Sequence, residues 1–407
     1  MQAFADTLSR TVRESLLGAV VGLLAGAASA GFLWALERVI GLRMAHPWLL
    51  FLLPVLGLVS AALYHWYGGE ADGGGTLVLD EALEFRGRVQ SRMAPLVLLG
   101  TLLTHLGGGS AGREGTAVQM GASLARSVGK LPWRFLKLTR SRQRRLLMAG
   151  VSAGFGSLFG TPVAGTVFGL EAVAIGKLHY EGLVICTAAS FVADWTCRGL
   201  GAHHAVFSVP APVFSWGLGI RMLLFAIPVA LVAGSFSELA HGLGRWSRRV
   251  LHPLARPVMG GLAVVLLAVI FPQDGFLNLG LPWLDQVFTS PHAVPSWAFL
   301  VKLVFTAVTV GFGFKGGEVT PLFVMGALLG AACAGILHIP VPVLAAVGFI
   351  GVFAAASNTP IASTLMGIEL FGSAFVGPIA VVSFVAYVLV GHRGIYGGHR
   401  IHTPKRP

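Results

Sequence analysis

The segment GFGFKGGEVTPLF, residues 311–323, places a carboxylate at the mouth of a long apolar stretch. Between residues 319 and 391 the only other Asp, Glu, Lys or Arg is Glu369. A carboxylate in a low-dielectric setting can hold a proton at neutral pH, because desolvation disfavours its charged form. Acids inside a membrane are therefore proton carriers by default. The position of Glu318, beside two glycines and ahead of Thr-Pro, favours a proton-handling site.

Three glycine-rich segments precede apolar segments, and each can begin a helix: GGGT (73–76), GREGT (112–116) and GGEVTP (316–321). A helix N-terminus presents unpaired N–H groups and about half a positive charge. Glycines let those N–H groups approach a ligand closely, which makes a helix start suited to an anion. Pro321 is tolerated at an early helical position, where its missing N–H is not needed. The spacing alone does not show that the three helix starts converge.

The composition indicates a polytopic membrane protein rather than soluble domains. Of 407 residues, 55% are hydrophobic and only 11% are charged. Uncharged runs approach the ~20 apolar residues that span a bilayer, and the shorter ones suggest tilted or half-crossing helices. The 55 glycines permit close helix packing and broken helices, a pattern typical of transporters and channels. The runs are Ser15–Leu36, Trp48–Tyr64, Met222–Phe236, Pro257–Gln273 and most of the chain from Val319 onward.

The net charge of +12 is concentrated in short segments beside apolar runs. Residues 126–145 hold eight Lys or Arg and no acid, and the N-terminal leader and the C-terminal tail are also basic. This is the positive-inside pattern, which predicts cytoplasmic N- and C-termini in a cell membrane. No basic soluble domain is evident, so nucleic acid is not an expected partner. The three cysteines have no paired spacing and no neighbouring His cluster, so we expect core packing and neither a disulfide nor a metal site.

An internal repeat predicts two halves within a single transport domain spanning 1–407. TPVAGTVFGLE (161–171) matches TPIASTLMGIE (359–369) with six identities at an offset of 198. A glycine-rich break followed by Met-Gly-Ala precedes each copy, which is typical of two-fold transporter folds. We expect halves of about 1–200 and 201–391, joined near 198–216. A short basic tail, 392–407, follows, and we expect no soluble regulatory domain.

The motifs resemble those of the CLC family of anion channels and transporters. GREGTAVQMG resembles the family's GREGP signature, GGEVTP its GxFxP element, and GGGTLVLDEAL its GSGIPE segment. GIYGG (394–398) resembles the region that carries the family's anion-coordinating tyrosine. Four motifs in order cover nearly the whole chain. The resemblance implies an all-α membrane fold, with an inverted repeat of tilted and broken helices in each subunit of a homodimer.

The departures from the family pattern indicate its fluoride/proton antiporter branch. The serine of GSGIP is replaced by Gly74 and the proline of GREGP by Thr116, while Glu318 stands in GxFxP where an apolar residue is usual. Chloride/proton exchangers carry an inner proton-transfer glutamate after the FxxE helix end; here Ala172 follows Glu171. Gly74 leaves the element that selects the anion unidentified.

We therefore expect fluoride export in exchange for protons, with no cofactor and no metal. Glu114 is the expected gating acid, which competes with the anion for helix N-termini and leaves when protonated, and Glu318 is the second proton-handling acid. Thr320 is expected to offer a hydroxyl near Glu318, and Tyr396 a phenol at the inner mouth. The resemblance implies these anion-binding residues: Gly74, Gly75, Gly112, Arg113, Gly115, Gly317, Val319, Thr320 and Tyr396.

Several alternatives remain open from the sequence. Glu318 could be an i, i+3 partner of Lys315, Glu114 could pair with Arg113, and Tyr396 could be an interfacial aromatic. For Glu171 and Glu369 we favour a structural role at helix ends. The same fold could serve a chloride/proton exchanger or a passive anion channel, with chloride as the anion. An enzyme is not expected, because the GxSxG match at 108–112 lacks a strand context and a triad.

Overall fold

The computed structural model describes residues 2–131, 139–204, 207–213, 215–290, 294–397 and 400–405. Within these ranges the regular structure consists of α-helices and short 3-10 turns, without a β-strand, so the all-α prediction is confirmed. The basic segment predicted at 126–145 is described only in part, because 132–138 lie outside these ranges. The same holds for 205–206 and 214 of the linker and for 398–399 and 406–407 of the tail.

Sixteen α-helices lie in the described residues, eight on each side of the linker. Those of the first half are α1 (Gln2–Ala45), α2 (Leu53–Tyr67), α3 (Gly74–Leu83), α4 (Met93–Leu106), α5 (Glu114–Val128), α6 (Arg140–Phe159), α7 (Pro162–Glu171) and α8 (Leu183–Gly199). Those of the second half are α9 (Trp216–Val250), α10 (Ala255–Ile270), α11 (Leu281–Thr289), α12 (Ala298–Gly311), α13 (Val319–Leu337), α14 (Val341–Ser357), α15 (Pro360–Phe371) and α16 (Val376–Leu389).

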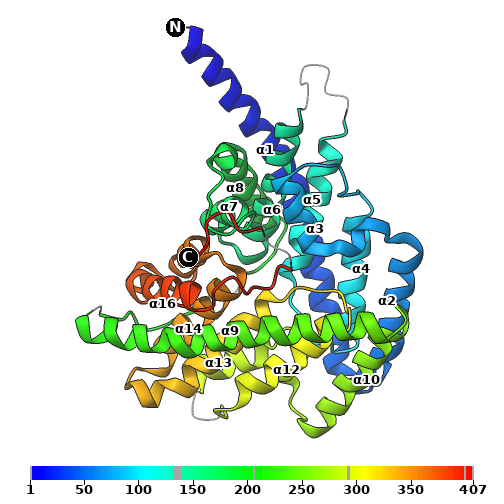
Figure 1. Cartoon of the computed structure of the whole chain (residues 1–407), viewed down its shortest axis with the longest axis vertical. Coiled ribbons are helices and arrows are strands. Elements are labelled where there is room, and N and C mark those ends of the chain that lie inside the picture. Colours follow the sequence, from blue (N-terminus) through cyan, green and yellow to red (C-terminus); the bar gives the residue numbers. More distant parts are fainter. Residues whose placement is uncertain are drawn as a thin grey trace.

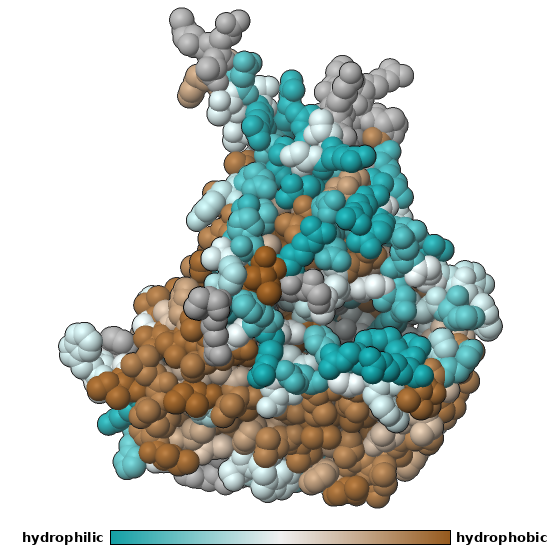
Figure 2. Space-filling model, viewed as in Figure 1, coloured by the Kyte–Doolittle hydropathy of each residue, from teal (hydrophilic) through white to brown (hydrophobic). Residues whose placement is uncertain are grey.

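The helix lengths suit a membrane protein with broken spans. Four segments are long and apolar enough to cross a bilayer: Phe4–Ala45, Pro47–Tyr67, Trp216–Val250 and Val319–Leu337. Several other apolar helices have only 10–17 residues, which confirms the expectation of spans shorter than a full crossing. Figure 1 shows α5 to α8 in the upper part of the molecule and α9, α12 and α13 in the lower part. Apolar side chains cover this lower part, whereas polar ones gather near the end where α1 begins (Figure 2).

Two glycine crossings fix the helices that carry the candidate site. Helix α5 packs against α6, and α13 packs against α14 in the same way. At the first crossing Gly121 faces Gly150, and at the second Gly326 faces Gly348. A Cβ added at any of these four glycines would collide with the opposite backbone. Only glycine allows backbones to approach this closely, so both helix pairs are held at one point.

A cluster of phenylalanines joins the two halves at the centre of the core. The rings of Phe155 and Phe168 from the first half stack with centroids 4.0 Å apart. In the second half, the rings of Phe323 and Phe349 stack at 4.1 Å. Phe353 stacks on Phe155 at 6.0 Å and meets Phe323 edge-on at 5.2 Å, which links the two pairs. The halves therefore share one core.

Of the cysteines, two are buried and one is partly buried, and all three are free thiols.

Candidate anion and proton site

The three glycine-rich segments do lead into helices that meet at one cavity. Helix α3 begins at Gly74, α5 at Glu114 and α13 at Val319, as the sequence predicts. All three starts line a cavity of about 580 Å³. The predicted site residues that line it are Gly74, Gly75, Glu114, Gly115, Gly317, Glu318, Val319 and Tyr396. The other three predicted site residues do not line the cavity but contact Glu114 or the start of its helix, as described next: Gly112, Arg113 and Thr320.

A pair of backbone hydrogen bonds ties the start of α5 to the start of α13. The N–H of Gly112 donates to the carbonyl of Gly317 over 2.5 Å, and the N–H of Gly317 donates back over 2.7 Å. A side chain at Gly317 has no room, because its Cβ would lie 2.7 Å from the nitrogen of Gly115. The glycines of both motifs therefore allow the close approach of two backbones.

The carboxylate of Glu114 lies on the N-terminus of α13. It accepts the backbone N–H of Arg113 at 3.0 Å and that of Thr320 at 3.1 Å. The hydroxyl of Thr320 also donates to it. The side chain is almost completely buried, at 1% exposure. Helix N-termini attract anions, and the ionised carboxylate of Glu114 fits such a position. Thr320, expected beside Glu318, thus serves Glu114 instead.

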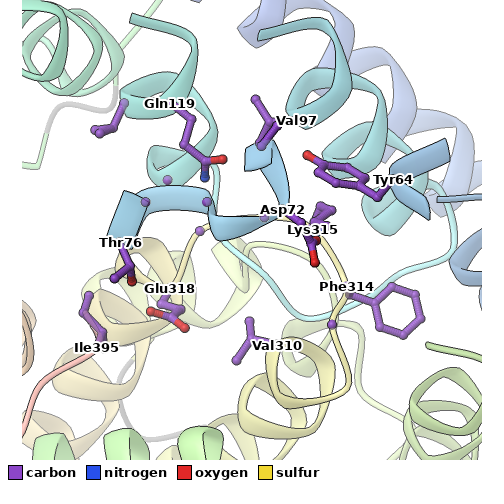
Figure 3. A pocket seen from close by; sticks show the side chains of 18 of the residues that line it. Tyr64, Asp72, Thr76, Val97, Gln119, Val310, Phe314, Lys315, Glu318 and Ile395 are labelled. Atoms are coloured by element: carbon purple, nitrogen blue, oxygen red, sulfur yellow. The ribbon is translucent and has the colours of Figure 1, made fainter. Parts of the chain in front are cut away.

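Glu318 lines the cavity, and no cation pairs with it among the residues that the structure describes. It is the residue before α13 and makes no capping hydrogen bond with its side chain. Lys315 is engaged elsewhere: its Nζ is 2.6 Å from Asp72 Oδ1 and 4.0 Å from the centre of the Tyr64 ring. The i, i+3 pairing considered for Glu318 is therefore wrong. Figure 3 shows the carboxylate of Glu318 turned into the space below α3.

Sequence reasoning missed several side chains that line the cavity. Gln119 and Thr76 lie close to the helix starts, and Asp72 and Lys315 lie further along the same wall (Figure 3). Gln119 was detectable, because it is the one amide in the apolar segment TAVQMGA. The ion pair of Lys315 lowers the pKa of Asp72, which lies in the turn Gly69–Gly73 outside the spanning helices. No local signal pairs these two residues, since they are 243 positions apart.

Gly74 occupies a backbone conformation that a side chain would strain. Its φ is +56°, in the left-handed region that favours glycine. A Cβ there would point toward the amide of Gln119, with its oxygen and nitrogen both at 3.9 Å. The amide of Gln119 therefore stands beside the position at which the family pattern has a serine hydroxyl. Thr116, the other departure, shares a hydrogen bond of 2.6 Å with Thr101 and so packs against α4.

The repeat-related acids Glu171 and Glu369 cap each other's helices. Glu171, at the end of α7, accepts the N–H groups of Ile361 and Ala362 at the start of α15, at 3.1 and 2.7 Å. Glu369, in α15, accepts those of Val163 and Ala164 at the start of α7, at 3.0 and 2.8 Å. This agrees with the structural role favoured for both acids. Ala172 is fully buried and offers no second acid at that helix end.

Broken helices whose N-termini meet at an acid-lined cavity, on helices suited to a bilayer, define a multi-pass integral membrane protein of the anion-transport class. The chain matches the voltage-gated chloride channel family over residues 56–391, and it belongs to this family, the CLC family. It is 42% identical to a chloride/fluoride channel protein of Pseudomonas syringae pv. tomato, over 98% of this chain and 89% of that one. The recognition of the family from its motifs is thus confirmed.

Two further comparisons bear on the branch. The crystal structure of a CLC-type fluoride/proton antiporter matches with a TM-score of 0.90 and 35% identity, covering 96% of this chain and 98% of that one. A H+/Cl− exchange transporter of Cronobacter sakazakii is 29% identical over 87% of this chain and 81% of its own length. All three relatives are channels or transporters by name, in agreement with the expectation that this chain is not an enzyme.

Proposed function

We propose that the protein exports fluoride in exchange for protons. The observation that carries this proposal is the carboxylate of Glu114 on the N-terminus of α13, with a second acid, Glu318, in the same cavity. Support also comes from the similarity to a CLC-type fluoride/proton antiporter over nearly the whole chain. Fluoride accumulates in cells because HF crosses membranes and dissociates inside, and proton-coupled export reverses this accumulation.

In the proposed cycle Glu114 and the anion alternate on the same donors. While ionised, the carboxylate accepts from the N–H groups of Arg113 and Thr320 and from the Thr320 hydroxyl. Protonation removes its charge, which weakens these hydrogen bonds and releases the side chain. Fluoride then occupies the vacated donors. Because fluoride is small and strongly hydrated, it needs strong donors of this kind.

Glu318 is proposed to pass the proton between the cavity and Glu114. It faces the cavity, and no cation among the described residues holds it in the ionised form. It would supply the proton step that Ala172 cannot. Tyr396 lines the same cavity and is proposed as a phenol donor to the anion. The glycines at the three helix starts are proposed to expose their N–H groups to it.

The main alternative keeps the fold and changes the transport mode. The name of the Pseudomonas relative favours a channel, and that of the Cronobacter relative a chloride/proton exchanger. The absence of an acid at Ala172 argues against the exchanger. The buried carboxylate on the α13 start argues against a permanently open pore, because it occupies the anion's position.

We further propose a single transport domain, halves of about 1–200 and 201–391, and a homodimer in the cell membrane with both termini cytoplasmic. The reciprocal caps between α7 and α15 support the two-fold halves. Apolar side chains on the outer surfaces of α8 and α16, among them Trp195 and Val388, call for cover by lipid or by a second subunit. Chemical crosslinking in native membranes would test the dimer.

The proposed function is tested with purified protein in liposomes loaded with fluoride or chloride. Ion-selective and pH electrodes outside report each ion as it leaves and the protons that enter. Fluoride release that drives proton uptake, far faster than chloride release, supports the antiporter. Equal release of both anions without proton movement contradicts it and makes the protein an anion channel. Chloride release coupled to proton uptake makes it a chloride/proton exchanger.

A further inference from the structure

A second cavity, of about 380 Å³, lies apart from the transport cavity and shares no lining residue with it. It is formed by the end of α3, the first turns of α6, the segment after α7 and the C-terminal tail. Its polar lining consists of Glu84, Arg144, Lys177, His179, Arg400 and His402. These are three cations and one carboxylate, and a second carboxylate, Glu181, lies 3.6 Å from Arg144, so the cavity keeps a surplus of positive charge.

Backbone contacts hold the tail over this cavity. The N–H of Ile175 donates to the carbonyl of Arg400, and the N–H of His402 donates to the carbonyl of Ile175, both over 3.0 Å. The guanidinium of Arg400 is 2.8 Å from Glu84 Oε2. The Nε of Arg144 donates to the carbonyl of Ala82 over 3.2 Å. Both guanidinium groups are thus placed by other elements and retain further N–H groups, since each has five.

In this cavity, one ring nitrogen of His179 lacks a hydrogen-bond partner among the described residues. His179 is 3% exposed, and its Nδ1 lies 3.2 Å from Oε1 of Glu181. An ionised carboxylate can only accept, so Nδ1 is the donor in this contact. The Nε2 on the other side of the ring is buried without a hydrogen-bond partner among the described residues. A buried polar atom left unpaired is costly, which points to a ligand that is not part of the chain.

We propose that this cavity binds a phosphate group. Planar guanidinium groups bind the oxygens of phosphate in pairs, and the lining has two of them from different elements, Arg144 from α6 and Arg400 from the tail. Lys177 adds a point charge and has no partner in the described residues. His179 supplies Nε2 to one ligand oxygen while Glu181 fixes the ring. A tetrahedral oxyanion uses such divergent donors, whereas a single halide ion does not.

The tail connects this phosphate site to the transport cavity. The segment that runs from Tyr396, which lines the transport cavity, continues through the described residues 400–405. Its far end is fixed by Lys405, whose Nζ donates to the carbonyl of Tyr387 over 2.7 Å. A ligand bound under Arg400 and His402 would restrain the chain that carries Tyr396. Occupancy should therefore change the transport rate, a consequence that rests on the proposed function.

Binding should strengthen as the pH falls. Burial lowers the pKa of His179, so the ring is neutral in the empty cavity at neutral pH. The charged or titratable groups around it are Glu181, Arg144, Lys177, Glu84, Arg400 and His402. An anion beside Nε2 favours the imidazolium, which donates from both nitrogens. Binding is therefore coupled to uptake of a proton by His179.

Isothermal titration calorimetry on the full-length purified protein tests the site, with inorganic phosphate and with sulfate as probes. Sulfate keeps its charge across the relevant pH range, so a pH dependence of its affinity reports on the protein. We expect sulfate affinity to rise about 3- to 10-fold from pH 7.5 to 6.0, and His179→Asn to remove this rise. Lys177→Gln should weaken binding about 10-fold, as expected for a lost charge-assisted contact. Lys130→Gln, on another loop, is the matched control.

Two outcomes overturn the proposal: no binding of either probe, or binding that Lys177→Gln leaves unchanged. A lipid source is distinguished by thermal stability in micelles with phosphatidic acid or phosphatidylcholine. Stabilisation by phosphatidic acid alone, lost in Lys177→Gln, assigns the phosphate to a lipid headgroup. Transport is then measured in liposomes with and without phosphate inside. Because binding is read without transport, failure of the antiporter proposal leaves the binding result intact.

Discussion

Two pairs of glutamates in this protein meet helix N-termini, and they do so differently. Glu171 and Glu369 form a symmetric pair, in which each carboxylate accepts two N–H groups from the helix start of the other half. Glu114 and Glu318, which belong to similar motifs, are not symmetric. Glu114 accepts from the start of α13, whereas Glu318 caps no helix and faces the cavity.

Under the proposed function, the difference separates a structural role of a carboxylate from a role in transport. In the symmetric pair, each carboxylate and the helix that it caps belong to opposite halves. The contact therefore joins the halves, and no step of the proposed cycle requires it to break. In the other pair only one acid is engaged, and an open cavity lies beside it. A carboxylate at a helix N-terminus is thus a permanent cap where no other anion can reach the N–H groups. Where an anion can reach them, it can replace the carboxylate.

The largest expected effect is on proton coupling. Glu114→Gln should abolish proton uptake driven by fluoride, and Glu318→Gln should reduce it by about two orders of magnitude, as is typical when a positioned proton-transfer group is lost. Glu369→Gln should retain coupling, because that carboxylate only caps α7. Proton uptake into liposomes measures all three. Loss of coupling in Glu369→Gln with full coupling in Glu318→Gln would reverse the comparison.

The next effect is on stability. Glu171→Ala leaves the N–H groups of Ile361 and Ala362 without their acceptor, which should cost about 2 kcal/mol of the free energy of unfolding. Thermal unfolding in detergent measures this, and Glu369→Ala should behave alike. Glu238→Ala is the control, because its pair with Arg393 is exposed on both sides. If the control loses as much free energy of unfolding as Glu171→Ala, the caps contribute no more to stability than an exposed ion pair.

A smaller effect is expected at the shared donor, Thr320. Its hydroxyl donates to the carboxylate of Glu114, and in the proposed cycle it donates to fluoride once that carboxylate leaves. Thr320→Val keeps the shape and removes the donor, so the KM for fluoride should rise about 5- to 10-fold, which corresponds to about 1 kcal/mol. Thr320→Ser should keep the KM of the natural protein. An equal rise in both variants would assign the effect to packing.

The smallest effect concerns the ion pair of Asp72 and Lys315 at the edge of the cavity. The Asp72 side chain is 64% exposed, so the pair should contribute less than about 1 kcal/mol. Lys315 lowers the pKa of Asp72, so this contribution is present above the ordinary Asp pKa and is lost as the pH falls through the lowered value. Asp72→Asn should flatten this part of the stability curve between pH 5 and 3. A larger loss at pH 7 would contradict the exposed-pair assignment.

The sequence predicts local features of the site better than its assembly. Helix starts at Gly74, Glu114 and Val319 follow from glycine and proline patterns that act within a few residues. Their convergence depends on how the halves pack, and so does the contact between Thr320 and Glu114. The ion pair of Lys315 with Asp72 also depends on packing. The sequence alone therefore suggested Glu318, three residues further on, as the partner of Lys315.

The repeat illustrates the same limit. An identical glutamate at the end of TPVAGTVFGLE and of TPIASTLMGIE predicts a shared role at helix ends. It does not reveal that each glutamate caps the opposite copy, because this requires the two-fold arrangement of α7 and α15 in space. The local pattern likewise does not show that Gly74 lies beside the amide of Gln119, since Gln119 approaches it from another helix.

The glycine crossings of α5 with α6 and of α13 with α14 leave these helices no space to slide. Their N-termini are also joined by the two hydrogen bonds between Gly112 and Gly317. Each crossing lies within one half, and rocking one half against the other would break the Gly112–Gly317 bonds, the reciprocal caps of α7 and α15 and the shared phenylalanine core. Turnover in this protein should therefore be set by the rotation of a few side chains, and distances between helices, measured with spin labels, should stay constant as the pH or the fluoride concentration changes.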